Sequence, residues 1–109
     1  MSGQIAAAQA QTVRVRCEST ADRSRASVDG SGLAPGQYRA VLSSGDHQKQ
    51  SPLQDAVGDE AEFDFDSNRK DVRQGATKIG RQFIVDNMVT GAILDVDGNT
   101  VAQDTVHCR

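Results

Sequence analysis

Hydrophobic and polar side chains alternate with a period of two in several short stretches of this chain. The clearest case is residues 60–66, where Ala61, Phe63 and Phe65 alternate with acidic residues. Residues 12–18 show the same period, with charged side chains between apolar ones. A period of two is that of a β-strand with one face buried and the other in water. Both stretches are therefore predicted to be half-buried strands.

Turn-forming residues separate further stretches with β-forming character. We expect strands at residues 23–28, 37–43, 82–85, 88–96 and 100–108. An Asp-Gly-Asn turn lies between the last two of these strands, and a turn of this kind between β-rich stretches predicts a hairpin. Three other segments are less regular.

Residues 47–58 are polar and contain Pro52, which favours an edge strand or a loop. Residues 67–75 are charged and predict a loop with room for one helical turn, and residues 76–80 are ambiguous. No helix of ordinary length and no internal repeat is present. About seven short strands separated by turns predict one domain over residues 12–109, an all-β antiparallel sandwich.

One turn carries a resemblance to known modules. Residues 32–38 read Gly-Leu-Ala-Pro-Gly-Gln-Tyr, in which Pro35 presets its own φ and Gly36 permits a positive φ. Leu33 and Tyr38 are expected to pin this corner to the core. The stretch resembles the G-L-x-P-G-x-Y corner of transthyretin-like and collagen-adhesin B-type modules, and fibronectin type III domains have a looser relative of it. The resemblance, over residues 28–41, implies a secreted immunoglobulin-like sandwich and carries over no functional residue.

The chain has two cysteines, Cys17 and Cys108, one near each end of the predicted domain. A bridge between them would close nearly the whole chain, for which the chain-entropy model gives about 4–5 kcal/mol of stability. The alternative is a pair of unbonded buried thiols in a cytosolic protein. We expect the disulfide, because both residues lie on strand-like alternations and the N-terminal residues suggest export.

That suggestion comes from Ala8-Gln9-Ala10, which has the small-x-small form of a signal-peptidase site. The residues before it contain neither a positively charged region nor a true apolar region. Two interpretations stay open, a remnant of a signal peptide and a disordered Ala/Gln-rich leader. Both place residues 1–11 outside the fold, and the first predicts a periplasmic or extracellular protein.

The net charge of −3 is unevenly distributed along the sequence. Residues 1–54 contain six Lys or Arg and four acids, whereas residues 55–109 contain six and eleven. A basic surplus with interleaved aromatic residues, as nucleic-acid binding requires, is missing, so no nucleic-acid partner is expected. No apolar stretch is long enough to span a bilayer, so no membrane insertion is expected.

The acids of residues 60–66 form the most conspicuous chemical feature of the sequence. They are Glu60, Glu62, Asp64 and Asp66, all on the polar side of the predicted strand. One interpretation is an interaction surface for a cationic partner or a weak divalent-cation site. The other, which we favour, is a solvated strand face beside a basic neighbour. Candidates for that neighbour are Arg14, Arg16, Arg23 and Arg25. Such cross-strand pairs contribute at most about 1 kcal/mol each.

Metal binding has weaker candidates. His47, Met88, His107 and Cys108 are ligand types of copper sites, but the close spacing of such ligands is missing. Residues 95–99 resemble the start of a calcium loop, yet the glycine falls at position 4 rather than 6 and a valine stands at position 12. We therefore assign no metal site and no cofactor.

Hydrolase motifs such as Gly-x-Ser-x-Gly and His-Glu-x-x-His are missing, so we expect no enzyme. The expected function is that of an exported, non-catalytic binding or structural module of the bacterial cell envelope or periplasm. Its protein or glycan partner would meet residues 44–58 and 67–80, which are more polar than a core strand needs. The alternative is a periplasmic protein that handles copper or calcium.

Overall fold

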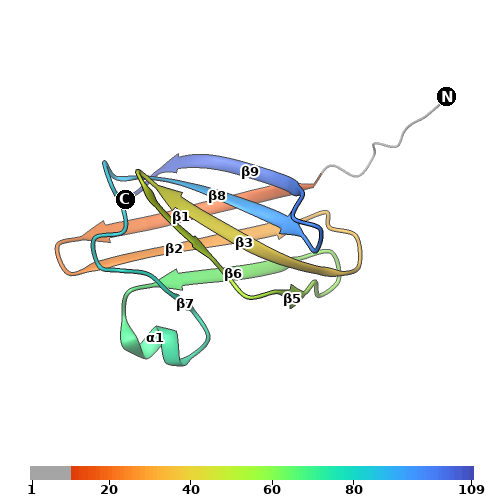
Figure 1. Cartoon of the computed structure of the whole chain (residues 1–109), viewed down its shortest axis with the longest axis horizontal. Coiled ribbons are helices and arrows are strands. Elements are labelled where there is room, and N and C mark those ends of the chain that lie inside the picture. The colour runs from red at the N-terminus through yellow and green to blue at the C-terminus, as the bar shows by residue number, and fades with distance from the viewer. Residues whose placement is uncertain (1–10) are drawn as a thin grey trace.

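The computed structural model describes residues 11–109, which form two β-sheets packed face to face (Figure 1). The first sheet has the order β1 (Thr12–Thr20), β2 (Arg23–Ser31), β6 (Ala61–Asp66) and β7 (Thr77–Lys78). The second has the order β4 (His47–Gln50), β3 (Gln37–Ser44), β8 (Met88–Asp95) and β9 (Thr100–His107), and β5 (Gln54–Asp55) also pairs with β3. Neighbouring strands are antiparallel except β6 and β7. The predicted all-β sandwich is confirmed.

The core lies between the sheets and is built by the alternation seen in the sequence. Val28 and Phe65 of the first sheet are almost fully buried, as are Leu42 and Ile93 of the second. Burying one face of each sheet in this way is the main source of stability in a sandwich. Gly91 of β8 packs directly against the side chains of Val15 and Val28 of the first sheet.

The turn that opens β3 has the geometry expected from its sequence. Leu33 and Tyr38 are both buried, and the hydroxyl of Tyr38 donates a hydrogen bond to the carbonyl oxygen of Ala34 at 2.7 Å. Gly36 has a φ of 148°, in the region that favours glycine. The side chain of Tyr38 thus holds the turn together by binding the backbone of Ala34, four residues earlier in the chain.

The sandwich is closed on one side by the bond between Cys17 and Cys108. Their Cα atoms lie 4.7 Å apart although 91 residues separate them in sequence. The backbone N–H of Arg109 donates to the carbonyl oxygen of Cys17 at 3.1 Å. The side chain of Asn87 donates to the carbonyl oxygen of Cys108 at 2.9 Å. The predicted disulfide is confirmed, and it joins β1 to the end of β9.

Residues 82–85, predicted as a strand, are instead part of a crossover from β7 to β8. Two buried serines hold this crossover. Ser24 donates to the carbonyl oxygen of Arg81 at 2.7 Å, and Ser44 accepts the N–H of Val85 at 2.7 Å. The prediction was wrong because serine hydroxyls on two other strands, rather than a neighbouring strand, satisfy the backbone of this apolar stretch.

The loop predicted after residue 66 contains the short helix α1 (Arg69–Arg73), whose N-cap is Asn68. No helix within residues 11–109 is both long and apolar enough to cross a membrane. The predictions for residues 1–10 lie outside the described residues.

Candidate functional site

The acidic residues singled out in the sequence do not form one uniform row. Glu60, Glu62 and Asp64 are exposed, as expected for a solvated strand face. Asp66 is only 5% exposed, so the expectation that it faces water is wrong. It is covered because β6 ends there and the chain turns into α1.

Asp66 belongs to a small ion-pair cluster at the end of β6. The guanidinium of Arg23 reaches both of its carboxylate oxygens, at 2.9 Å and 2.6 Å. The same guanidinium binds Asp71 of α1 at 2.8 Å, and the N–H of Asn68 donates to Asp66 at 2.9 Å. Burial alone would raise the pKa of Asp66, but these hydrogen bonds outweigh it and hold the pKa below its ordinary value. The cluster therefore fixes α1 against the first sheet.

The basic neighbour expected for the acidic row is only partly present. Arg23 and Arg25 lie on β2, next to β6, whereas Arg14 and Arg16 lie on β1, which β2 separates from β6. Asp29 occupies the β2 position opposite Glu62. Burial, and then the negative charge of Glu62, raise the pKa of Asp29. Like charges therefore face each other at this end of the sheet.

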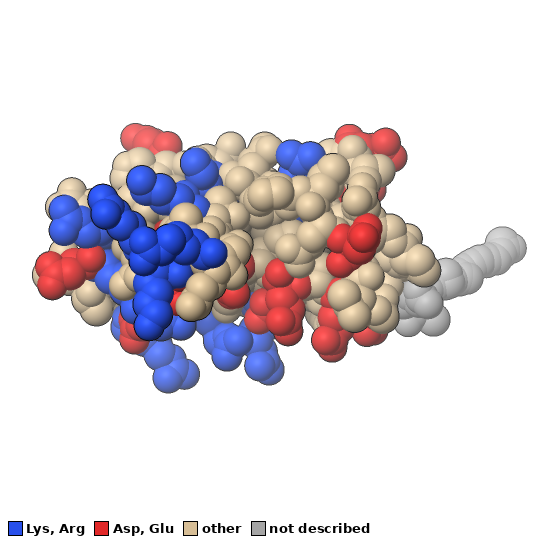
Figure 2. All heavy atoms as spheres, turned by 90° about the horizontal axis from the view of Figure 1, so that it is seen from below, with Lys and Arg blue, Asp and Glu red and all other residues tan. Residues whose placement is uncertain are grey.

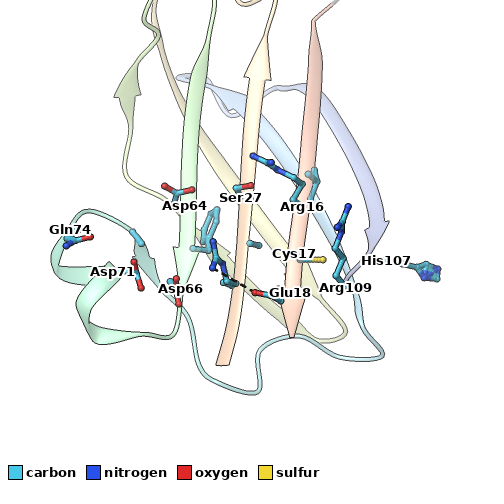
Figure 3. A pocket seen from close by; sticks show the side chains of 15 residues that line it. Arg16, Cys17, Glu18, Ser27, Asp64, Asp66, Asp71, Gln74, His107 and Arg109 are labelled. Atoms are coloured by element: carbon cyan, nitrogen blue, oxygen red, sulfur yellow. Dashed lines mark ion pairs between the residues drawn. The ribbon is translucent and has the colours of Figure 1, made fainter. Parts of the chain in front are cut away.

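A broad open hollow of about 820 Å³ lies over the outer face of the first sheet. Figure 3 shows Asp64, Asp66 and Asp71 on one side of it, with Arg16 and Arg109 on the other. Most of these charges already have partners within the protein. Besides the Arg23 cluster, the structure contains the pairs Arg16–Asp29 at 3.4 Å and Arg25–Glu18 at 3.9 Å. Exposed pairs of this kind contribute little to stability, and the hollow offers a polar surface rather than an enclosed site.

The candidate metal ligands do not converge. His47 lies on β4, where its Nδ1 is 2.7 Å from the carbonyl oxygen of Phe83. Met88 and His107 are opposite each other in the β8–β9 ladder, and Cys108 is oxidised. Within residues 11–109 no group of three or more His, Cys, Asp or Glu side chains is arranged to hold a metal ion.

The calcium-like turn is held by its own hydrogen bonds. The carboxylate of Asp95 accepts the backbone N–H groups of Asp97 at 2.9 Å and Asn99 at 3.0 Å. These bonds are those of a side chain that stabilises a tight turn.

A second hollow, a groove of about 530 Å³, lies on the side of the sandwich opposite the disulfide. It separates β4, at the edge of the second sheet, from the crossover that follows β7. Lys49 and Lys78 line its two rims, and Ile79 and Phe83, both buried, lie at its base. We call this hollow the edge groove. It brings together part of residues 44–58 and part of residues 67–80, the two segments predicted to contact a partner.

Hydrogen bonds between distant segments position the base of the edge groove. The Ser24 and Ser44 bonds fix the crossover on either side of Phe83. His47 ties β4 to the carbonyl of Phe83, and the two rings lie 5.5 Å apart. A carbonyl oxygen only accepts, so Nδ1 of His47 carries the proton in this contact. The groove is thus held by the tertiary structure rather than by a flexible loop.

Five exposed cations lie on and after α1, and one of them, Lys78, lines the edge groove. They are Arg69, Lys70, Arg73, Lys78 and Arg81. We call them the basic segment. None of them forms an ion pair with a described residue, in contrast to Arg16, Arg23 and Arg25. Figure 2, which views the molecule from the side of α1, shows most Lys and Arg gathered towards one end, whereas Asp and Glu are spread over both ends.

The basic segment is not apparent in the charge balance of the two halves of the chain, because the acids of residues 55–66 offset its positive charge. A shorter window would have found it, because residues 69–81 contain five cations and one acid, Asp71. The placement of Lys49 and Lys78 around the same groove has no such local signal.

In comparisons with known proteins, no family model, curated protein or solved structure matches this chain. Function must therefore be argued from the residues and surfaces described above.

Proposed function

We propose that this chain is an exported, non-catalytic binding module and that the edge groove and basic segment form its contact surface. The observation that carries the proposal is the convergence of β4 and residues 78–83, two segments distant in sequence, on one groove. The cations around it have no ion-pair partner among the described residues, unlike Arg16, Arg23 and Arg25 of the first sheet. Unpaired charge on a rigid surface is available for an outside partner at little structural cost.

The disulfide supports export. Cysteines in the cytosol are kept reduced, and stable structural disulfides are typical of secreted and periplasmic proteins. Here the bond ties the first strand to the residue that follows the last strand, so it holds both ends of a small domain. A bond in that place is expected where the protein has to remain folded outside the cell's reducing compartment.

The strand order supports an immunoglobulin-like relationship. With β1, β2 and β6 as strands A, B and E, and β3, β4, β8 and β9 as C, C′, F and G, these strands follow an order similar to that of such sandwiches. The position of strand D is taken by β7, which follows β6 in sequence and is parallel to it. The disulfide departs from the antibody pattern, which joins strands B and F. Sandwiches of this kind commonly serve as binding modules, which agrees with the proposal by analogy alone.

A crosslinking experiment tests the proposal. A photo-crosslinking amino acid is placed at Gly80 or Gln82, which line the edge groove, and separately at Gln103 of β9 as the matched control. Each variant is produced with an export signal in cells that carry the gene, and the envelope fraction is illuminated. We expect one discrete adduct from each groove position and none from Gln103. Equal adducts from all three positions, or adducts from Gln103 alone, would contradict the proposed surface.

A further inference from the structure

The outer edge of β4 has backbone groups free to pair with another strand. In an antiparallel ladder, hydrogen-bonded and non-bonded residue pairs alternate. The N–H of Ser51 donates to the carbonyl oxygen of Ala40 at 2.9 Å, which makes that pair a bonded one. Continuing the register, Lys49 is bonded to β3, while the N–H and C=O groups of Gln48 and Gln50 point away from it. Among residues 11–109 no backbone group pairs with that edge.

This free edge borders the edge groove, so an added strand would meet specific side chains. Successive side chains of a strand point to opposite faces. Those of His47 and Lys49 therefore share the face of β4 that looks towards the crossover, where Lys78 forms the other rim. An added strand would place every second side chain on that face, between two ammonium groups and above the apolar base.

The residues around β4 also limit which strand can pair. A lysine on a short edge strand is a common device against unwanted pairing, and Pro52 ends the strand soon afterwards. Lys49 disfavours a second copy of β4, because two such strands would bring like charges together. An acidic strand would instead place carboxylates beside Lys49, and opposite charges favour pairing. The basic segment further attracts an anionic partner from a distance.

We propose that β4 accepts, as an added strand, an extended acidic segment of a partner protein whose alternate carboxylates face Lys49 and Lys78. This inference rests on the proposed function, because it names the partner chemistry of the same groove. Strand addition obtains affinity from main-chain hydrogen bonds and specificity from alternate side chains. A glycan partner has less support, because all four aromatic side chains of the protein are buried and offer no exposed face for stacking.

Peptide binding to the full, disulfide-bonded chain tests the inference. The probe is a short fluorescent peptide in which Glu alternates with Thr, and its binding is followed by fluorescence anisotropy. Two altered peptides serve as controls. One has Lys in place of Glu, and the other has N-methyl groups on the backbone edge that would face β4. We expect the first peptide to bind and each control to bind at least about tenfold more weakly, which corresponds to about 1.4 kcal/mol.

Variants of the protein locate the binding. Lys49→Glu and Lys78→Glu should each weaken binding about tenfold, whereas Arg14→Glu, the same charge change on the opposite edge of the first sheet, should leave it within about twofold. Gln48→Pro removes one outward N–H without removing a bond to β3, and should also weaken binding. Circular dichroism checks that this variant keeps its fold, and the N-methylated peptide tests the same bond without altering the protein.

The inference is overturned if the Glu-Thr peptide does not bind, or if it binds equally well after N-methylation. Displacement of the peptide by a polyuronic oligosaccharide, together with insensitivity to N-methylation, would identify a charge-driven glycan surface instead. The crosslinking experiment separates the two proposals. Groove adducts without peptide binding would leave the contact surface in place and reject the acidic strand, whereas the absence of both would reject both.

Discussion

Nδ1 of His47 lies 2.7 Å from the carbonyl oxygen of Phe83, and this contact joins the edge strand of the second sheet to the crossover that leaves the first. The two residues are 36 positions apart in sequence. Their contact sets the width of the edge groove, since one residue belongs to a rim and the other to the base.

Replacing His47 by alanine should loosen this connection. A hydrogen bond of this kind contributes about 1 kcal/mol to the free energy of unfolding. We expect His47→Ala to lower stability by about that amount, measured by urea unfolding. Amide hydrogen exchange should increase in residues 81–85 more than elsewhere. Gln48→Ala, on the neighbouring exposed position, is the control. Equal exchange in the two variants would show that the imidazole contact does not hold the crossover.

The Arg23–Asp66 pair gives a stability that depends on pH. Hydrogen bonds lower the pKa of Asp66 below its ordinary value of 3.8 despite its burial. Because the pKa of Asp66 is lowered in the folded protein, its carboxylate contributes fully to the free energy of unfolding at pH values above 3.8. This contribution is lost as the pH falls through the lower pKa of the folded state. We expect Asp66→Asn to lower the free energy of unfolding by about 3 kcal/mol at neutral pH. This value is at the low end for a broken buried ion pair, because Arg23 is partly exposed to solvent.

Unfolding free energies of the wild type and Asp66→Asn, measured across this pH range, check the expectation. The difference should shrink steadily as the pH falls below 3.8. Asp64→Asn, on the exposed position two residues earlier, should change little. A cost for Asp66→Asn that is the same at every pH would show that the carboxylate charge contributes nothing.

The disulfide should account for much of the stability of this small domain. Closing a loop of this length gives about 4–5 kcal/mol in the chain-entropy model, although the origin of the effect depends on the model. We expect reduction, or Cys17→Ser with Cys108→Ser, to lower the melting temperature by tens of degrees or to prevent folding at 37 °C. Intact mass after alkylation without reductant should show no modified thiol. Two alkylated cysteines in the native protein would also remove the argument for export.

Gly91 of β8 lies against the first sheet with no room for a side chain. A Cβ atom there would lie 2.8 Å from Cγ2 of Val15 and 2.9 Å from Cγ2 of Val28, which is too close for real side chains. Gly91→Ala should therefore destabilise the protein by about 1–3 kcal/mol through overpacking. Gly80→Ala is the control, because no atom lies within 4 Å of the added carbon. Equal melting temperatures of the two variants would contradict the packing described here.

Much of the fold follows from local sequence patterns. The alternation of Phe63 and Phe65 with acids predicted β6 because the period of a strand is visible within a few residues. The same reasoning failed for residues 82–85, where consecutive apolar residues fill the open side of the core. Their backbone partners, Ser24 and Ser44, are about 40 or more residues away and leave no local signal.

The candidate site was harder to predict than the fold. The polarity of residues 44–58 and 67–80 indicated them as contact segments, but no sequence pattern predicted that Lys49 and Lys78 line the same groove. The burial of Asp66 was missed for a related cause, since it depends on Arg23, which is 43 residues away. Periodicity predicts which face a residue occupies, whereas a site depends on which faces meet.

The most direct test of the account is amide hydrogen exchange at Gln48 and Gln50, with and without the Glu-Thr peptide. In the free protein these two amides should exchange quickly and that of Lys49 slowly, because only the latter donates within the sheet. With the peptide present, Gln48 and Gln50 should become protected while the amides of β1 remain unchanged. Protection of Gln48 and Gln50 in the free protein, or new protection confined to the outer face of the first sheet, would contradict the proposed binding edge.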